Sequence, residues 1–252
     1  MRVIVTRPAL QAAEWVQRLG QQGIDAEALP LIGIEPVDDP APLAAAWRTL
    51  AQQRLVVFVS PNAAEHFIAR RPPAVAWPAG VLAGSPGRGT TRALVALGVP
   101  AAQIVEPAAD ALQFDSEALW AQLARHDWRG AQVLIVRGDG GRDWLADTLR
   151  EHGAQVSQVA AYRRVAPAFD ARGRALLQRA LDDPNAHLWL FSSSEAIDHL
   201  AVSMPSATWS RAQAIASHPR IAARARRLGF ERVTEVRPSL DAVVACIQSL
   251  RS

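Results

Sequence analysis

Residues 133–142 read VLIVRGDGGR, an unbroken apolar run that passes directly into a loop of arginines, glycines and an aspartate. Such a mostly β-branched run is typical of a strand that is buried on both faces. Trp144, Leu145 and Leu149 follow at helical spacing, and Gly153 ends the pattern. The stretch predicts a strand, a polar loop and a helix, the repeating unit of parallel α/β folds.

Four further apolar runs predict strands of the same kind. They span residues 3–5, 55–59, 188–191 and 212–216. Each is followed by a short loop of polar residues, glycine or proline and then by a helical pattern, as where Leu10, Ala13 and Leu19 mark one helix. This alternation predicts a doubly wound α/β fold with parallel sheets.

The two parts of the chain repeat the same order of motifs. Residues 3–8 (VIVTRP) correspond to 134–138 (LIVRG), and residues 57–64 (VFVSPNAA) correspond to 189–196 (WLFSSSEA). The offset of roughly 131 residues is far longer than the period of a solenoid repeat. We therefore predict two similar α/β halves.

The boundary between the halves has two solutions in the sequence alone. A division near residue 128 follows the repeat. Alternatively, residues 32–37 (IGIEPV) and 160–165 (AAYRRV) are extended crossovers between domains. In that case residues from about 37 to 163 form one domain, and both ends of the chain form the other.

The basic residues exclude several kinds of chemistry. All 27 lysine-plus-arginine positions are arginines, so a lysine Schiff base and an ordinary P-loop are both ruled out. The net charge is only +3, and with a single tyrosine and a single cysteine almost nothing titrates at alkaline pH. The pI of about 10.2 therefore does not indicate nucleic-acid binding.

Cysteine and histidine usage narrows the possibilities further. Cys246 has no partner for an intrachain disulfide, and the six histidines show no HExxH or comparable spacing. No apolar run reaches the roughly 20 residues of a membrane span, and Arg7 and Pro8 interrupt any signal-peptide core. We expect a cytoplasmic protein without a metal site or membrane attachment.

Small polar residues, glycines and arginines gather in the loops that follow the predicted strands. Ligands of open α/β sheets bind beyond the carboxyl ends of the strands, where helix N-termini attract anions and arginine adds bidentate contacts. This pattern indicates a polyanionic ligand. The candidate substrate-binding residues are Arg7, Ser60, Asn62, Thr90, Arg137, Gly138, Asp139, Ser192, Ser193, Ser194, His218 and Arg220.

Each of these loops also has a purely structural interpretation. Serine, threonine, asparagine and aspartate at such positions are common helix N-caps. Residues 137–142 can form a turn closed by an aspartate–arginine pair. Six similar loops in two halves favour a shared anionic ligand over capping alone.

Residues 133–143, 153–156 and 161–164 resemble the central signature of the uroporphyrinogen-III synthases. Further matches occur in the family's order at residues 3–8, 58–63, 89–98, 218–222 and 228–230, so that the resemblance covers essentially the whole chain. It implies two α/β domains joined by a two-stranded ladder, with an active-site cleft between them. It also implies that the N-terminal segment belongs to the C-terminal domain. We therefore expect one domain of residues 1–36 plus 164–252 and a second of residues 37–163.

The resemblance implies that the chain cyclises hydroxymethylbilane, a linear tetrapyrrole with eight carboxylates, to uroporphyrinogen III, inverting ring D through a spiro intermediate. It implies no cofactor, no nucleic-acid partner and a monomer. Ser60, Thr90 and residues 192–194 match positions that hold the substrate, and Tyr162 matches a tyrosine that assists hydroxyl loss without being essential. The loop at 83–91 (AGSPGRGTT) departs from the family pattern Val-Gly-x-x-Thr-Ala, which leaves its contacts open.

Two other functions fit the same two-lobed pattern. One is a binding protein for an anionic small molecule. The other is a flavodoxin-like enzyme that uses FMN or a nucleotide, and a purified protein without a flavin spectrum would dismiss its FMN form.

Overall fold

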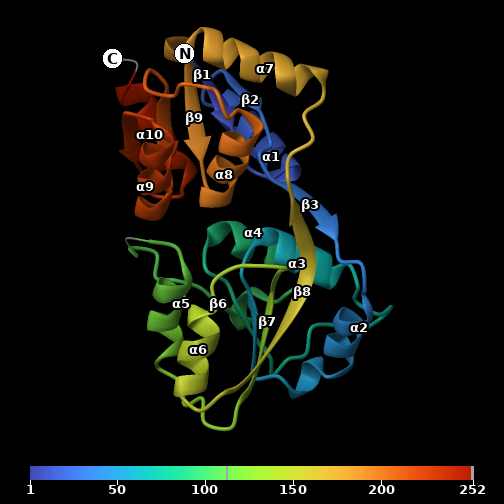
Figure 1. The fold of residues 1–252 in the computed structure, drawn as a ribbon. Helices are drawn as coiled ribbons and strands as arrows, with labels where there is room; N and C mark the ends of the chain where they lie inside the picture. The colour runs from blue at the N-terminus through green and yellow to red at the C-terminus, as the bar shows by residue number, and fades with distance from the viewer. Residues whose placement is uncertain (112, 251–252) are drawn as a thin grey trace. The chain divides into compact units, whose positions relative to one another are not determined.

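The computed structural model describes residues 1–111 and 113–250 (Figure 1). The chain divides into a middle unit, Ile34–Arg164, and a terminal unit, which combines Met1–Gly33 with the chain from Val165 onward. Two strands carry the chain across this division, β3 (Gly33–Pro36) and β8 (Gln155–Val165). Among the helices of these residues, none has the length and hydrophobicity that spanning a bilayer requires.

The middle unit is built on a six-stranded sheet with the order β3-β8-β7-β4-β5-β6. From β8 to β6 the neighbouring strands run parallel. Its other strands are β4 (Leu55–Phe58), β5 (Leu82–Gly84), β6 (Ile104–Val105) and β7 (Gln132–Gly138). Its helices are α2 (Ala41–Arg48), α3 (Pro61–Ile68), α4 (Arg88–Ala96), α5 (Ser116–Leu123) and α6 (Trp144–Glu151), with short 3₁₀ turns at Leu50–Gln52 and Ala101–Gln103.

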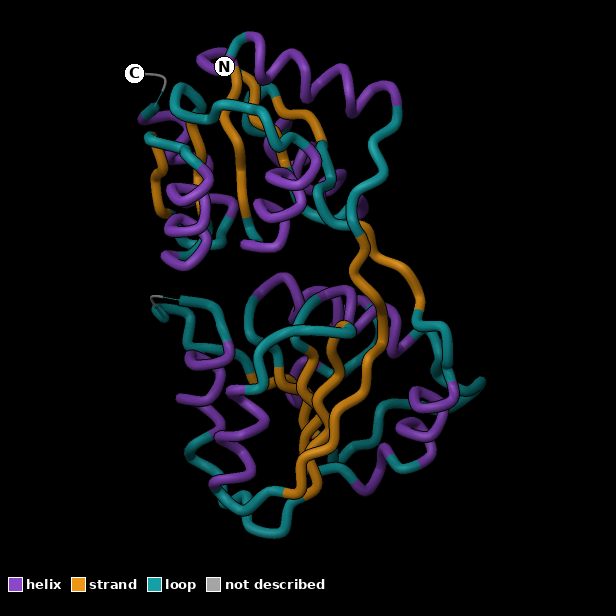
Figure 2. The backbone as a smooth tube through the Cα atoms, in the orientation of Figure 1, coloured by secondary structure: helices purple, strands orange, loops and turns teal. Residues whose placement is uncertain are grey.

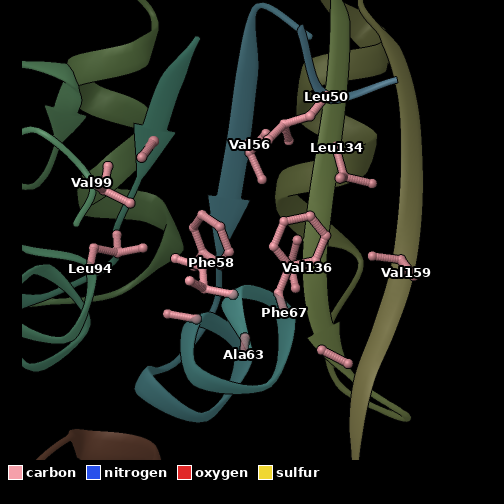
Figure 3. Packing of buried hydrophobic residues seen from close by; sticks show 14 of the residues in the cluster. Leu50, Val56, Phe58, Ala63, Phe67, Leu94, Val99, Leu134, Val136 and Val159 are labelled. Carbon is pink, nitrogen blue, oxygen red and sulfur yellow. The ribbon is translucent and has the colours of Figure 1, made fainter. Parts of the chain in front are cut away.

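Strand β4 shows why the central strands of this sheet, β4 and β7, are apolar. Successive side chains of a strand point to opposite faces. Val56 and Phe58 therefore join the core under α2, α3 and α4, where the rings of Phe58 and Phe67 lie 5.7 Å apart (Figure 3). Leu55 and Val57 join a second core with α5 and α6. Both faces of β4 are buried, which explains its unbroken hydrophobic run.

The terminal unit has a five-stranded parallel sheet with the order β11-β10-β9-β1-β2. Its strands are β1 (Arg2–Val5), β2 (Ala26–Ala28), β9 (His187–Phe191), β10 (Gln213–Ala216) and β11 (Arg232–Glu235). Its helices are α1 (Ala9–Gly20), α7 (Ala171–Asp182), α8 (Ser194–Ser203), α9 (Pro219–Leu228) and α10 (Leu240–Ser249), with a 3₁₀ turn at Pro184–Ala186.

The two faces of this sheet differ in chemistry. Val5 and Leu190 belong to an aliphatic core that includes residues of α1 and α10. Trp189 begins an aromatic cluster in which Trp209 and Phe230 stack with ring centroids 5.2 Å apart. Such stacking adds to the hydrophobic stabilisation that burial itself provides. In each unit the strands lie among flanking helices (Figure 2).

The strand orders confirm two similar doubly wound halves. Counted from β1, the terminal sheet has the order 2-1-3-4-5. Without β3, the middle sheet has the same order when β7 and β8 are counted first and β4, β5 and β6 follow. The helix starts fix the correspondence between the halves, because Ser60 precedes α3 as its N-cap and Ser193 precedes α8 in the same way. The equivalent of Ser60 is therefore Ser193, one residue later than the alignment of the motifs predicts.

Candidate functional site

In the middle unit, the candidate site lies where β7 and β4 end. The helix after β7 packs on one face of the sheet through Leu145 and Leu149, and the helix after β4 packs on the other face through Ala63 and Phe67. The helices that follow these two neighbouring strands, α6 and α3, thus lie on opposite faces of the sheet. This is the switch point at which parallel α/β sheets bind ligands.

Tyr162 lies at this switch point and is buried. Its hydroxyl is 3.1 Å from the Ser60 Oγ, and the Arg164 guanidinium donates a longer hydrogen bond of 3.4 Å to the same oxygen. The His66 ring lies 5.8 Å from the Tyr162 ring. A phenol, an alcohol, a guanidinium and an imidazole therefore meet at the strand ends, and Arg164 and His66 were not among the residues predicted from sequence.

Gly138 and Asp139 meet Tyr162 from the end of β7. A Cβ atom at Gly138 would lie 3.0 Å from the Tyr162 Cζ, so glycine is the residue that lets the ring approach. The Asp139 N–H donates to the Tyr162 carbonyl at 3.0 Å, and an Asp139 carboxylate oxygen accepts from the Arg164 N–H at 3.2 Å. The structure thus brings Ser60, Gly138, Asp139 and Tyr162 together.

The other predicted residues of the middle unit lie in the first turns of α3 and α4. The Ser60 Oγ caps α3 by accepting from the Ala63 N–H at 3.1 Å, and Asn62 in the first turn is buried. Thr90 is buried in the first turn of α4, and a Cβ at the adjacent Gly89 would lie 3.7 Å from Pro61. The two helix starts are neighbours, so their positive ends point to one region.

The structure defines the contacts of the loop at 83–91. Ser85 is fully buried, and its Oγ donates to the Gly87 carbonyl at 2.9 Å. The Thr91 hydroxyl lies 3.0 Å from that Oγ and 2.5 Å from a Glu106 carboxylate oxygen. Ser85 and Thr91 therefore hold the loop together, and Thr90 is buried between them in the chain.

Arg137 pairs with Asp143, an aspartate just beyond residues 137–142, the range expected to form a turn closed by its own aspartate–arginine pair. Its guanidinium donates to Asp143 and, at 2.7 Å, to Gln158. Its side chain is only 12% exposed, since these partners cover it. The Arg137 hydrogen bond is the main reason that the pKa of Asp143 lies below its ordinary value, with Gln158 contributing a second hydrogen bond.

In the terminal unit, β1 and β9 occupy the positions of β7 and β4. The Thr6 hydroxyl donates to the Leu190 carbonyl at 2.8 Å and joins the two strand ends. Arg7 follows, and its guanidinium lies over the Trp15 ring at 4.5 Å. This cation–π contact directs the arginine along α1.

The remaining predicted residues of the terminal unit lie at two helix starts. Residues 192–194 are half-buried around the start of α8, and the Ser193 hydroxyl makes no capping hydrogen bond there. His218 caps α9, where its Nδ1 accepts from the Arg220 N–H at 3.1 Å, and Arg220 is exposed. Each helix start presents backbone N–H groups that suit an anion.

His66, whose ring lies beside Tyr162, has a shifted pKa. Burial lowers the pKa of His66, and the nearby positive charge of Arg70 lowers it further. Within residues 1–111 and 113–250, no group of three or more His, Cys, Asp or Glu residues is placed to hold a metal ion.

Comparisons with known proteins identify the family. A family model described as "Uroporphyrinogen-III synthase HemD" matches residues 13–245. The uroporphyrinogen-III synthase of Escherichia coli K12 is 28% identical over 243 residues, which cover 92% of this chain and 93% of that protein. The enzyme of the same name from Salmonella typhimurium LT2 is 31% identical over 177 residues, or 70% of each chain.

A solved structure agrees with this assignment at the level of the fold. The uroporphyrinogen-III synthetase of Helicobacter pylori matches with a TM-score of 0.58 over the whole of both chains, at 18% sequence identity. The same two-unit α/β architecture therefore persists where little sequence is shared. With a family model that spans nearly the entire chain, the protein belongs to the uroporphyrinogen-III synthase family.

Proposed function

We propose that this protein converts hydroxymethylbilane into uroporphyrinogen III, the reaction for which its family is named. The observation that carries the proposal is the Tyr162 hydroxyl held 3.1 Å from Ser60 at the switch point of the middle sheet. Family membership over residues 13–245 supports the reaction. The contact between the Tyr162 and Ser60 hydroxyls supports the proposal that the reaction is assisted at this point of the middle unit.

The reaction begins when the terminal hydroxyl of hydroxymethylbilane leaves as water. The oxygen takes the electron pair of the C–O bond and a proton, and the pyrrole nitrogen stabilises the remaining cation, which is a protonated azafulvene. Ring D then attacks through its substituted carbon and forms a spiro centre. One C–C bond of that centre breaks and re-forms on the other side of ring D, and loss of a proton restores the aromatic ring.

Tyr162 and Ser60 act on the departing hydroxyl in this proposal. Tyr162 is buried whereas Ser60 is only half-buried, so Ser60 is the more accessible residue of the pair. A hydrogen bond from Ser60 to the leaving oxygen, supported by Tyr162 behind it, eases its departure. Because the azafulvene also forms without an enzyme, this assistance accelerates the reaction without being indispensable.

The larger task is to select among competing closures. Spontaneous closure gives the uninverted isomer, so the protein must hold the chain in the conformation that leads to the spiro route. We propose that helix N-termini and small hydroxyl residues bind the substrate carboxylates. The residues assigned to this task are Arg7, Asn62, Thr90, Ser192, Ser193, Ser194, His218 and Arg220, with Gly138 shaping the strand end. Arg137 is assigned a structural role instead, because its guanidinium is engaged by Asp143 and Gln158.

The setting of the reaction forms part of the proposal. We propose a cytoplasmic monomer that works without a cofactor, which agrees with a chain that contains one cysteine and no lysine. Light scattering of the purified protein tests the monomer, and its absorption spectrum tests for a bound flavin. A dimer or a flavin band would contradict these two points.

The product isomer tests the function directly. Purified protein is supplied with hydroxymethylbilane, the product is oxidised to porphyrin, and the type I and type III isomers are separated. Reactions without protein and with heat-denatured protein give the spontaneous level of type I. Predominantly type III product supports the proposal, and type I alone rejects it in favour of a binding protein.

A further inference from the structure

Strand β8 contains a bulge where it passes the end of β7. Arg137 is paired with Ala160, but the next residue, Gly138, is paired with Tyr162, so that Ala161 is an extra residue in β8. A bulge interrupts the alternation of side chains, and Ala161 and Tyr162 are accordingly both buried. The bulge therefore sets the direction in which the Tyr162 side chain points.

Asp139 holds both sides of this irregular segment. Its N–H donates to the Tyr162 carbonyl at 3.0 Å, and its carboxylate accepts from the Arg164 N–H at 3.2 Å. A bulge leaves backbone groups without their regular ladder partners. The side chain of Asp139 supplies an acceptor for the Arg164 N–H, which lies beyond the last β7–β8 pair, and ties β8 to the residue that follows β7.

The Tyr162 hydroxyl is fixed by what surrounds it. On one side the hydroxyl packs so closely against Gly138 that a Cβ atom at this position would lie 3.2 Å from the hydroxyl oxygen. On the other side are the Ser60 Oγ at 3.1 Å and the Arg164 guanidinium at 3.4 Å. Both Tyr162 and Arg164 contact Asp139 through their backbones. Asp139 is thus linked to the Tyr162 hydroxyl in two ways, through the backbone of Tyr162 itself and through Arg164, whose guanidinium donates to that hydroxyl.

We propose that Asp139 is a positioning residue that keeps the Tyr162 hydroxyl beside Ser60, and not a ligand of the substrate carboxylates. Its kinetic consequence rests on the function proposed above. The chemistry favours this role, because a carboxylate repels a polycarboxylate substrate whereas it accepts readily from a backbone N–H. Asp139 therefore leaves the set of substrate-binding residues.

Asp139→Ala and Asp139→Asn separate the two roles kinetically. Asparagine keeps an acceptor oxygen and removes the charge, so D139N should retain wild-type kcat and KM. Alanine removes the acceptor, so D139A should lose about tenfold in kcat with little change in KM. A tenfold loss is what the free energy of one hydrogen bond corresponds to when that bond aligns a group in the transition state. Because Asp139 acts through Tyr162, the double variant D139A/Y162F should be no slower than Y162F.

The chain's single tyrosine offers a second readout that is independent of the reaction. Protein labelled with ¹³C at the tyrosine Cζ gives one signal, whose chemical shift reports the environment of the hydroxyl. D139A should move or broaden this signal, and D139N should keep it. Asp147→Ala is the matched control, because Asp147 pairs with Arg150 on the surface of α6.

Each result decides the proposal. An unchanged Cζ signal in D139A overturns it, even if the wild type yields only type I product. A D139N variant as slow as D139A also overturns it, since the charge of Asp139 and not its hydrogen bond would then determine the rate. The proposal likewise fails if the loss of kcat in D139A adds in full to that of Y162F in the double variant. If D139A moves the signal while the wild type makes no type III product, the proposed function fails and the positioning role stands. Should D139A not fold, Asp139→Ser, whose hydroxyl is too short to reach Arg164, replaces it.

Discussion

The Tyr162 hydroxyl and the Ser60 Oγ lie 3.1 Å apart although 102 positions separate them in the chain. The bulge in β8 supplies the tyrosine, and the N-cap of α3 supplies the serine. Their contact joins β8 to the end of β4 across β7, beside the switch point at which a parallel sheet binds its ligand. The first prediction concerns this pair.

Tyr162→Phe should lower kcat by about tenfold while the product remains mainly type III. The substitution removes one hydrogen bond, worth about 1.4 kcal/mol in the transition state, and leaves the ring packing in place. Steady-state kinetics with isomer separation measure both effects. If a variant with a wild-type circular dichroism spectrum formed no type III product, Tyr162 would be indispensable and the assisting role would be wrong.

Gly138→Ala should destabilise the protein by about 1–2 kcal/mol, because the new methyl group collides with the Tyr162 ring. In a Tyr162→Ala background the same change should cost almost nothing, since the ring is gone. Urea unfolding of the four proteins measures this coupling. Gly140→Ala is the control, because no atom lies within 4 Å of a Cβ at that position. An equal cost with and without the ring would place the strain elsewhere.

Glu27→Gln should destabilise the terminal unit by about 1–2 kcal/mol. Its side chain is 11% exposed and accepts from Arg2, Arg172 and Arg179, which joins β1 and α7 to the edge strand β2. We expect no larger loss of unfolding free energy, because the arginines are partly exposed and solvent screens their interaction with Glu27. Glu14→Gln, which breaks one exposed pair with Arg18, should change the unfolding free energy far less. Equal effects in urea unfolding would mean that the three-arginine cluster contributes nothing special.

His66 should make stability fall as the pH falls below about 6.5. Its folded-state pKa lies below the ordinary 6.5, so at mildly acidic pH the unfolded chain binds a proton that the folded protein does not. The stability is complete above pH 6.5 and is lost progressively as the pH drops from there toward the folded-state pKa. Unfolding free energies measured from pH 7.5 to 5 should show this loss in the wild type and a smaller loss in His66→Gln. The exposed His126→Gln serves as the control and should behave as the wild type.

The strands buried on both faces could be predicted from sequence. Residues 133–136 and 188–191 are continuous apolar runs because helices cover both sides of their sheets. The three-residue strand β2 has no such signature, because its central residue is Glu27, whose charge is neutralised by arginines from elsewhere in the chain. An ion-paired edge strand cannot be recognised until its partners are known.

The candidate site was predicted in kind but not in detail. Composition indicated hydroxyl and glycine residues at the strand ends, and Ser60 and Gly138 lie there. The direction of Arg137 depends on Gln158, a residue of the neighbouring strand, and the role of Asp139 depends on a bulge. The direction of Arg137 and the contacts of Asp139 both depend on the register between β7 and β8. A shift of one residue would change that register, and the residues around each position do not reveal it on their own.

The pairing of β1 with β9 has a consequence for biosynthesis. The Thr6 hydroxyl bonds a carbonyl 184 positions later, while every strand from β4 to β7 lies between these partners in the chain. On the ribosome β1 can pair with β2 early, but its other edge must wait for β9 until translation has passed the whole middle unit. That unit emerges as one uninterrupted segment and can close its own sheet first. During synthesis the β9-facing edge of β1 is consequently an unpaired strand edge, the kind of surface that chaperones protect.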